Sequence, residues 1–188
     1  MQTNENNENT KENQGLVLWL TGLSGAGKTT IANKVAEKLY NQGFKYEIID
    51  GDIIRSQLNL NLGFNDEGRK KNVSIAGYVA NLLSKHGVIV LVALISPFRE
   101  QRNMMKKTIN NFVEIYVNAP LEICIQRDEK GLYRKAIAGE IKNFTGISHG
   151  YEAPLCPDIE LNTDTENVEQ SEEKIILFLN NNYFRGIT

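Results

Sequence analysis

Residues 22–29 read GLSGAGKT and fit the phosphate-binding pattern GxxxxGK[ST] at every fixed position. The stretch lies between a short unbroken apolar run, 16–20, and a segment in which Ile31, Val35 and Leu39 recur every four residues. This is the order of strand, glycine-rich loop and helix that the motif requires. Glycine lets several backbone amides turn toward one phosphate group. We therefore predict a loop that binds the phosphates of a nucleoside triphosphate.

Two side chains of this loop have expected chemical roles. Lys28 should contact the β- and γ-phosphates, and the Thr29 hydroxyl should ligate Mg²⁺. The alternative is a glycine-rich turn that binds nothing, and the flanking strand and helix argue against it. The predicted nucleotide-binding residues are Gly22, Leu23, Ser24, Gly25, Ala26, Gly27, Lys28, Thr29, Thr30 and, from a later segment, Arg127.

The rest of the chain alternates apolar runs typical of strands with helical periodicity. The strands are expected at 16–20, 46–49, 88–95, 112–117 and 159–161. Helices are expected after the phosphate loop as far as Gly43, at 67–85, after Pro97, from Pro120 through Arg127, and around 168–179. The alternation predicts an α/β fold: a three-layer sandwich of the phosphate-loop nucleoside-triphosphate hydrolase type, with a mainly parallel sheet of about five strands. Ligands of such a sheet bind beyond the carboxyl ends of its strands.

Length and composition favour one folded domain and a small ligand. The chain has 188 residues, of which 1–14 include five Asn, three Glu and one Lys and no apolar residue after Met1. We expect a disordered tail at 1–14 and one folded domain of the phosphate-loop type at 15–188. The net charge of -2 argues against nucleic acid and membrane partners. No apolar run has bilayer length, no signal peptide is recognisable, and two cysteines fit a reducing compartment, so a soluble cytoplasmic protein is expected.

A pair of acids follows the second predicted strand, in Asp50-Gly51-Asp52. The third predicted strand runs into 95–97, ISP, and brings no acid. Asp52 could orient Mg²⁺ or accept a proton from an attacking hydroxyl, if its strand lies next to the phosphate loop. The alternative is a solvated Asp-Gly turn. A switch GTPase would need an NKxD loop after a strand, whereas Asn33-Lys34 lies inside the first helix, so a small kinase fits better.

The segment from about 128 to 146 is dense in charge and contains three glycines. It has the composition of a lid that brings cations over the phosphates and excludes water. A solvated helix with scattered charge is the alternative. The cationic candidates are Arg127, Lys130, Arg134 and Lys135.

The chain closely resembles the adenylylsulfate kinase family, in motifs that run from about Gly15 to the C-terminus. The motifs are the phosphate loop with Thr30, Asp50-Gly51-Asp52 with Arg55, Leu62-Gly63-Phe64, Ile95-Ser96-Pro97, Arg127-Asp128, Lys130-Gly131-Leu132-Tyr133, Gly139-Glu140-Ile141-Lys142, Phe144-Thr145-Gly146-Ile147 and Tyr151-Glu152-Ala153-Pro154. The family transfers the γ-phosphoryl group of ATP to the 3′-hydroxyl of adenosine 5′-phosphosulfate, in sulfate assimilation or sulfation. The resemblance thus implies an ATP- and Mg²⁺-dependent phosphotransferase with an alcohol acceptor, a small nucleotide substrate and, by analogy, a homodimer.

The resemblance also implies roles for individual residues. Lys28, Asp52 and Ser96 would be catalytic, and Thr29 and Asp52 would hold the metal. Ser96 matches a position sometimes described as a phosphoserine intermediate; we interpret it as a hydrogen-bonding group of the acceptor site, because direct in-line transfer needs no covalent relay. The acceptor would be bound by Asp52, Arg55, Phe64, Arg69, Asn72, Ile95, Ser96, Lys130, Leu132, Phe144 and Thr145. Phe64 and Phe144 suit stacking on adenine, and Arg55 and Arg69 suit pairing with a phosphosulfate anion.

The departures from the family pattern concern charge. The family usually has DRxEN followed by Ile and two arginines, where this chain has GRKKNVSI at 68–75. Gly68 and Lys71 therefore stand where the family has acids, Ser74 and Ile75 replace arginines, and Ile137 replaces a lid cation. Weaker closure or a different acceptor could follow. The alternatives are a related kinase of another nucleotide conjugate, such as cytidine diphosphoramidate, and a degenerate member that only binds nucleotide.

Overall fold

The computed structural model describes residues 15–57 and 65–184. Five parallel strands form one sheet in the order β2-β3-β1-β4-β5. The tail predicted at 1–14 and the residue Phe64 lie outside the described residues. The predicted α/β fold with a parallel sheet of five strands is confirmed. The strands are β1 (Leu16–Thr21), β2 (Tyr46–Asp50), β3 (Ile89–Ala93), β4 (Phe112–Asn118) and β5 (Ile159–Asn162).

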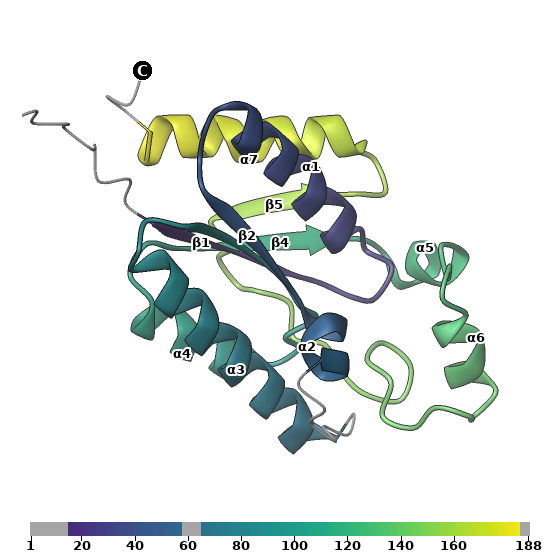
Figure 1. Ribbon diagram of the computed structural model, residues 1–188. Coiled ribbons are helices and arrows are strands. Elements are labelled where there is room, and N and C mark those ends of the chain that lie inside the picture. Colours follow the sequence, from purple (N-terminus) through teal and green to yellow (C-terminus); the bar gives the residue numbers. More distant parts are fainter. Residues whose placement is uncertain (1–14, 58–64, 185–188) are drawn as a thin grey trace, which may run out of the picture.

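Helices cover both faces of the sheet and give three layers (Figure 1). On one face lie α1 (Lys28–Asn41) and α7 (Val168–Asn182), and on the other lie α3 (Asp66–Ser84) and α4 (Arg99–Thr108). Three short helices lie at the carboxyl ends of the strands: α2 (Gly51–Gln57), α5 (Leu121–Gln126) and α6 (Leu132–Ile137). Irregular and short elements therefore gather at the end of the sheet where ligands of this architecture bind.

The central strand β1 explains why the sheet is covered twice. All six of its residues are buried, and successive side chains of a strand point to opposite faces. Leu18 and Leu20 pack in a core with α1 and α7, while Val17 and Trp19 pack in a second core with α3 and α4. Each such side chain contributes about 1.5–3 kcal/mol when fully buried. An unbroken apolar run is thus the sequence signature of a strand with no solvated face.

Four elements differ from the sequence prediction. The third strand ends at Ala93 rather than at Ile95, because the carbonyl of Ile95 accepts a hydrogen bond from Thr21 Oγ1 at 2.8 Å and the chain turns away at Ser96. The helix predicted from Pro97 begins at Arg99. The short helices α2 and α6 were not predicted; α2 begins directly where β2 ends.

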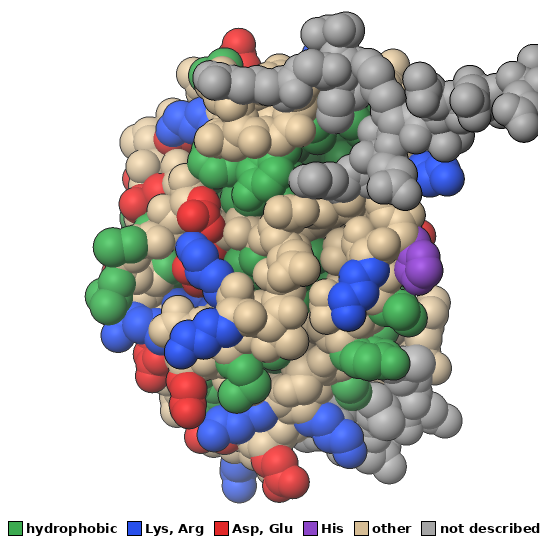
Figure 2. Space-filling model, turned by 90° about the vertical axis from the view of Figure 1, so that its left-hand side faces the viewer, with side chains coloured by type: hydrophobic (Ala, Val, Ile, Leu, Met, Phe, Trp, Pro, Cys, Tyr) green, Lys and Arg blue, Asp and Glu red, His purple; other side chains and the backbone are tan. Residues whose placement is uncertain are grey.

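The surface at the amino ends of the strands shows no concentration of one charge sign. Figure 2 looks onto this end, and Lys or Arg side chains alternate there with Asp or Glu side chains and with hydrophobic ones. This face of the described residues offers no basic stripe of the kind that binds nucleic acid.

None of the helices in the described parts of the chain is long and apolar enough to cross a bilayer.

Candidate active site

The phosphate loop joins β1 to α1 and rests directly on the backbone of β4 and α5. Gly22 and Gly25 have φ angles of 154° and 73°, which a side chain would disfavour. A Cβ on Gly22 would lie 2.3 Å from Val117 O, and one on Gly25 would lie 3.0 Å from Cys124 O. Glycine is therefore required at both positions by close packing as well as by the backbone angle.

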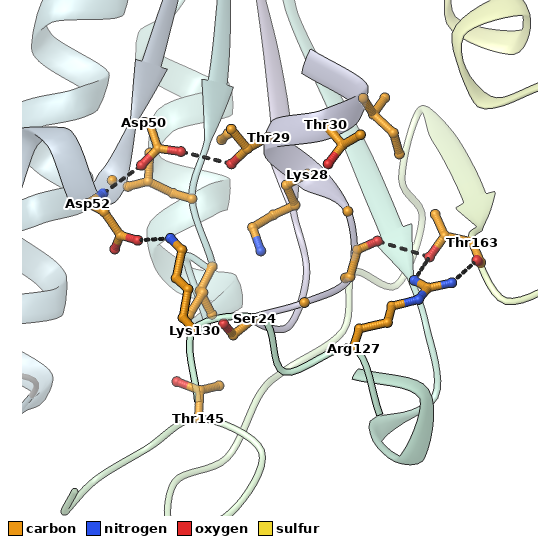
Figure 3. A pocket seen from close by; sticks show the side chains of 18 of the residues that line it. Ser24, Lys28, Thr29, Thr30, Asp50, Asp52, Arg127, Lys130, Thr145 and Thr163 are labelled. Atoms are coloured by element: carbon orange, nitrogen blue, oxygen red, sulfur yellow. Dashed lines mark hydrogen bonds and ion pairs between the residues drawn. The ribbon is translucent and has the colours of Figure 1, made fainter. Parts of the chain in front are cut away.

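Lys28 is the first residue of α1, and its side chain lies beside the phosphate loop and lines the pocket (Figure 3). Its Nζ donates hydrogen bonds to Gly22 O at 3.0 Å and to Leu23 O at 2.7 Å. Burial lowers the pKa of Lys28 to about 8, and the neighbouring carboxylates of Asp50 and Asp52 only partly offset this. Its ammonium group is thus held by backbone carbonyls, from which it can move to the oxygens of a phosphate.

A chain of polar contacts connects the start of α1 to the two acids at the end of β2 and the start of α2 (Figure 3). Thr29 Oγ1 donates to Asp50 Oδ2 at 2.8 Å, and Asp50 Oδ1 accepts from the Asp52 amide at 2.8 Å. Asp52 Oδ2 accepts from Lys130 Nζ at 2.7 Å, and this bond raises the pKa of Lys130. The structure thus brings Asp50 to Thr29, while Asp52, expected beside the metal, is paired with the predicted lid.

The contact between Thr29 and Asp50 does not come from neighbouring strands. β3 lies between β1 and β2, so β2 is not the neighbour of the strand that carries the phosphate loop. The contact is made instead by the first turn of α1, where Thr29 lies. Asp50 therefore lies beside Thr29 at the start of α1, and the third strand brings no acid to this place.

The oxygen atoms of this cluster suit a magnesium ion. Mg²⁺ usually binds one or two carboxylates together with water and substrate phosphates. The Thr29 hydroxyl and the carboxylates of Asp50 and Asp52 are hard oxygen donors of that kind. Within 15–57 and 65–184, no group of three or more His, Cys, Asp or Glu side chains could hold a metal alone. The donor set therefore fits an ion that arrives with the nucleotide.

Arg127 marks the other side of the phosphate loop. Its guanidinium donates to the hydroxyl and the carbonyl of Thr163, the first residue after β5. Thr163 Oγ1 donates in turn to Ala26 O at 2.9 Å (Figure 3). Arg127 is thus fixed beside the loop, and its binding of a nucleotide stays a prediction. Thr163 was not predicted.

The segment predicted as a lid is tied to the phosphate loop by Tyr133. Its hydroxyl donates to Ser24 O at 2.9 Å, and burial raises its pKa. The Asp128 carboxylate accepts from the amides of Tyr133 and Arg134 at 3.0 and 2.9 Å, which caps the first turn of α6. The ring of Phe144 meets Tyr133 edge to face, with centroids 5.0 Å apart. Whether the segment closes over substrates stays a prediction.

Two arginines and an asparagine line the opposite end of the pocket. Arg69 is 5% exposed and donates to Thr145 Oγ1 and Asn143 O. Burial and the positive charge of Arg55 lower the pKa of Arg69. Asn72 is 4% exposed, and its Oδ1 has no hydrogen-bond partner among the described atoms. The structure thus places two cations and a buried acceptor together, an arrangement that favours an anionic ligand with a polar hydrogen to donate.

The predicted aromatic stack is only partly described. Phe144 is 7% exposed and packs in the core against Tyr133, while it also lines the pocket. Phe64 lies outside the described residues. Stacking of an adenine between the two rings therefore stays a prediction.

Ser96 lies at the floor of the pocket with its hydroxyl turned into the protein. Its side chain is 2% exposed, its Oγ accepts from Trp19 Nε1 at 3.0 Å, and it donates to Thr21 Oγ1 at 3.1 Å. Its φ angle of 39° is left-handed, which is rare for a residue with a side chain. The hydroxyl is thus committed to bonds within the protein, and its direct contact with an acceptor stays a prediction.

One cavity of about 730 Å³ unites these features. Asp50, Tyr133 and Thr163 also line it and were not predicted as site residues; Asp50 and Thr163 each lie at the carboxyl end of a strand, which was the available signal. Gly22 and Leu23 belong to the loop but do not line the cavity. The predicted residues that line it are Ser24, Gly25, Ala26, Gly27, Lys28, Thr29, Thr30, Asp52, Arg55, Arg69, Asn72, Ile95, Ser96, Arg127, Lys130, Leu132, Phe144 and Thr145.

Comparison with known proteins decides the family. The model of the family described as adenylylsulphate kinase matches residues 14–162. The chain belongs to the adenylylsulfate kinase family. It is 56% identical over 162 residues to an adenylyl-sulfate kinase of Rippkaea orientalis, covering 86% of this chain and 90% of that one. It is 54% identical over 165 residues to the corresponding protein of Picosynechococcus sp., covering 88% and 93%.

A solved structure supports the same assignment. The fold resembles that of an APS kinase from Mycobacterium tuberculosis in complex with AMPPNP and APS, with a TM-score of 0.85 and 40% identity. The match covers 89% of this chain and 98% of that one. The chain therefore shares the adenylylsulfate kinase fold over nearly its whole described length.

The three positions at which this chain lacks a cation of the adenylylsulfate kinase pattern lie away from the cavity. Ser74 is exposed on α3, where its Oγ donates to Lys70 O, and Ile75 beside it is partly buried. Ile137 ends α6 and is 60% exposed. None of the three is among the described residues that line the cavity. The lost charges therefore do not remove a wall of the site.

Proposed function

We propose that this adenylylsulfate kinase family member transfers the γ-phosphoryl group of ATP to the 3′-hydroxyl of adenosine 5′-phosphosulfate. The products are ADP and 3′-phosphoadenosine 5′-phosphosulfate. The proposal includes Mg²⁺ as the metal, sulfate assimilation as the process, the cytoplasm as the compartment and, by analogy with the family, a homodimer. It rests on family membership together with the geometry of the cavity.

The observation that carries the proposal is a single cavity with two different ends. Around the phosphate loop it offers backbone amides, Lys28 and Arg127, which suit the triphosphate and base of ATP. Around Arg69 and Asn72 it offers cations and a buried unpaired acceptor, which suit a second, anionic nucleotide. Two nucleotide sites that share one cavity are what direct transfer between two bound molecules requires.

The proposed roles follow from where the side chains lie. Lys28 exchanges Gly22 O and Leu23 O for phosphate oxygens and stabilises the charge that develops on the transferred group. Asp52 accepts the proton of the attacking hydroxyl once Lys130 has moved from its carboxylate to the substrate. Asp50 keeps Thr29 oriented on the metal side. Thr29, Asp50 and Asp52 would hold Mg²⁺, which would supply positive charge against the phosphates.

The decisive experiment is the identity of the product. The protein is incubated with MgATP and a panel of adenylyl and cytidylyl conjugates, and product mass and the site of phosphorylation are determined. Adenosine 5′-phosphosulfate should be phosphorylated at its 3′-hydroxyl with a far higher kcat/KM than a cytidine diphosphate conjugate. The reverse preference would favour a related kinase of another conjugate, and nucleotide binding without turnover of any acceptor would favour a binding protein.

A further inference from the structure

Arg102 carries a buried positive charge outside the lining of the pocket. It lies on α4, is 1% exposed, and its guanidinium contacts three separate segments. Its Nε donates to Glu114 Oε1 at 2.7 Å, Nη1 to Ser96 O at 2.7 Å, and Nη2 to Glu152 O at 2.6 Å. A buried charge is tolerated when it is paired and fully hydrogen-bonded. Glu114 supplies the opposite charge here, and each of the three guanidinium nitrogens donates one hydrogen bond.

The first of these carbonyls belongs to the strained turn at the floor of the pocket. Ser96 has a left-handed backbone, which a residue with a side chain keeps only where its surroundings define it. Arg102 fixes its carbonyl, while Trp19 and Thr21 fix its hydroxyl. All three residues of the turn 95–97 line the pocket. Arg102 therefore holds the backbone of one pocket wall from behind.

The second carbonyl belongs to a segment that is stapled to the same turn. The Glu152 amide donates to Pro97 O at 2.9 Å, and the Glu152 carboxylate accepts from the Arg99 amide at 2.8 Å. Arg99 Nε donates to Ala153 O at 2.6 Å. Together with Arg102, these bonds join 151–153 to the beginning of α4.

This stapled segment continues into the other wall of the acceptor end. Seven residues before Glu152 lies Thr145, which lines the pocket and accepts a hydrogen bond from Arg69. Tyr151 OH also hydrogen-bonds Thr21 Oγ1, with 3.0 Å between the oxygens. The staple around Arg102 thus links the turn 95–97 to the segment that carries Thr145.

We propose that Arg102 is a positioning residue for the acceptor nucleotide. It sets the spacing between the turn 95–97 and the segment 144–153 without touching the substrate. The identity of the acceptor rests on the function proposed above. No hydrogen bond of Arg102 in the described parts of the chain goes to the phosphate loop, Arg127 or Thr163. Loss of the staple therefore changes acceptor binding and leaves ATP binding in place.

The test is the variant Arg102→Lys, which keeps the charge beside Glu114. A single ammonium group lacks the planar fork that reaches three diverging acceptors. We expect the KM for adenosine 5′-phosphosulfate to rise at least about tenfold and the KM for ATP to stay within about twofold. The matched control is Lys106→Gln on the same helix, which removes an exposed ion pair with Asp158 at 3.0 Å. Neither KM should change in the control.

A second variant keeps the test decisive if Arg102→Lys does not fold. Arg99→Met removes the bond to Ala153 O from a less buried position. It should raise the KM for the acceptor about two- to fivefold with no change in the KM for ATP. The proposal is overturned if the folded variants leave the acceptor KM unchanged or raise both KM values equally. If the unmodified protein does not phosphorylate adenosine 5′-phosphosulfate, the proposed function fails instead, and the two failures are distinct.

Discussion

Nucleotide binding should return a proton to Lys28, because the free protein holds this lysine in a site that disfavours its charge. Burial lowers its pKa to about 8, and its partners in the absence of nucleotide are two neutral carbonyls. The triphosphate of ATP brings several negative charges to the same ammonium group and should restore a pKa at or above the ordinary value of lysine. With a pKa of about 8, about three-quarters of the Lys28 side chains in the nucleotide-free protein are neutral at pH 8.5. Nucleotide binding at this pH should therefore take up about 0.75 of a proton per nucleotide.

The uptake has a characteristic dependence on pH. At pH 7.0 only about 0.1 of a proton should be taken up, because most Lys28 side chains are already charged. The affinity for MgATP should therefore be about tenfold weaker at pH 9 than at pH 7. Calorimetric titration in two buffers of different ionisation enthalpy measures the uptake directly.

A matched variant isolates the lysine in this assay. Lys28→Arg keeps a cation but cannot lose its proton in this range, so the uptake at pH 8.5 should disappear. An uptake below about 0.2 of a proton in the unmodified protein at pH 8.5, or an equal uptake in Lys28→Arg, would refute the reasoning.

The other expectations concern the same pocket. Lys28→Met should lower turnover at least about 10²-fold, or about 3 kcal/mol. The same variant should raise the melting temperature at pH 7, because the pKa of Lys28 is lower in the folded protein than in the unfolded chain and its charge therefore destabilises the fold. This destabilisation is greatest below about pH 8 and fades as the pH approaches the pKa of lysine in the unfolded chain. Ser96→Ala should cost about 1–3 kcal/mol of stability, since Trp19 Nε1 loses its acceptor, but slow turnover only about tenfold or less; a dead variant, with radiolabel on Ser96 that chases into product, would support a covalent relay. Asp52→Asn should lower kcat about 10²-fold or more while Asp50→Asn chiefly raises the Mg²⁺ concentration needed for half-maximal rate; identical kinetic defects in the two variants would contradict this division of roles.

The fold could be predicted largely because buried strands leave a strong signal. The run 16–20 is apolar at every position, and the structure buries it on both faces. The end of β3 could not be predicted, since it depends on Thr21 and Ser96, which lie 75 residues apart in the chain. A side-chain hydrogen bond to a carbonyl of a neighbouring strand does not show in the periodicity of the local sequence.

The site was predictable as a set of residues but less so as a set of contacts. The motif Asp50-Gly51-Asp52 indicates a polar cluster, yet it does not say which acid contacts Thr29. In an extended strand the two acids would point to the same side, but a helix begins at Gly51, so their side chains diverge. Asp50 bonds Thr29, and Asp52 bonds Lys130. The division follows from where one element ends and the next begins, which is the least predictable property of a sequence.

The two ends of the cavity are built from different parts of the chain, and this makes them separately alterable. The proposed donor end depends on the loop after β1 and on Thr163 after β5, whereas the proposed acceptor end depends on α3, the turn after β3 and the segment around Thr145. A change of acceptor, in the laboratory or in evolution, can therefore proceed by substitutions on α3 and around Thr145 while the machinery that holds ATP is inherited intact. One fold can in this way come to phosphorylate new acceptors while it keeps the same binding site for the phosphoryl donor.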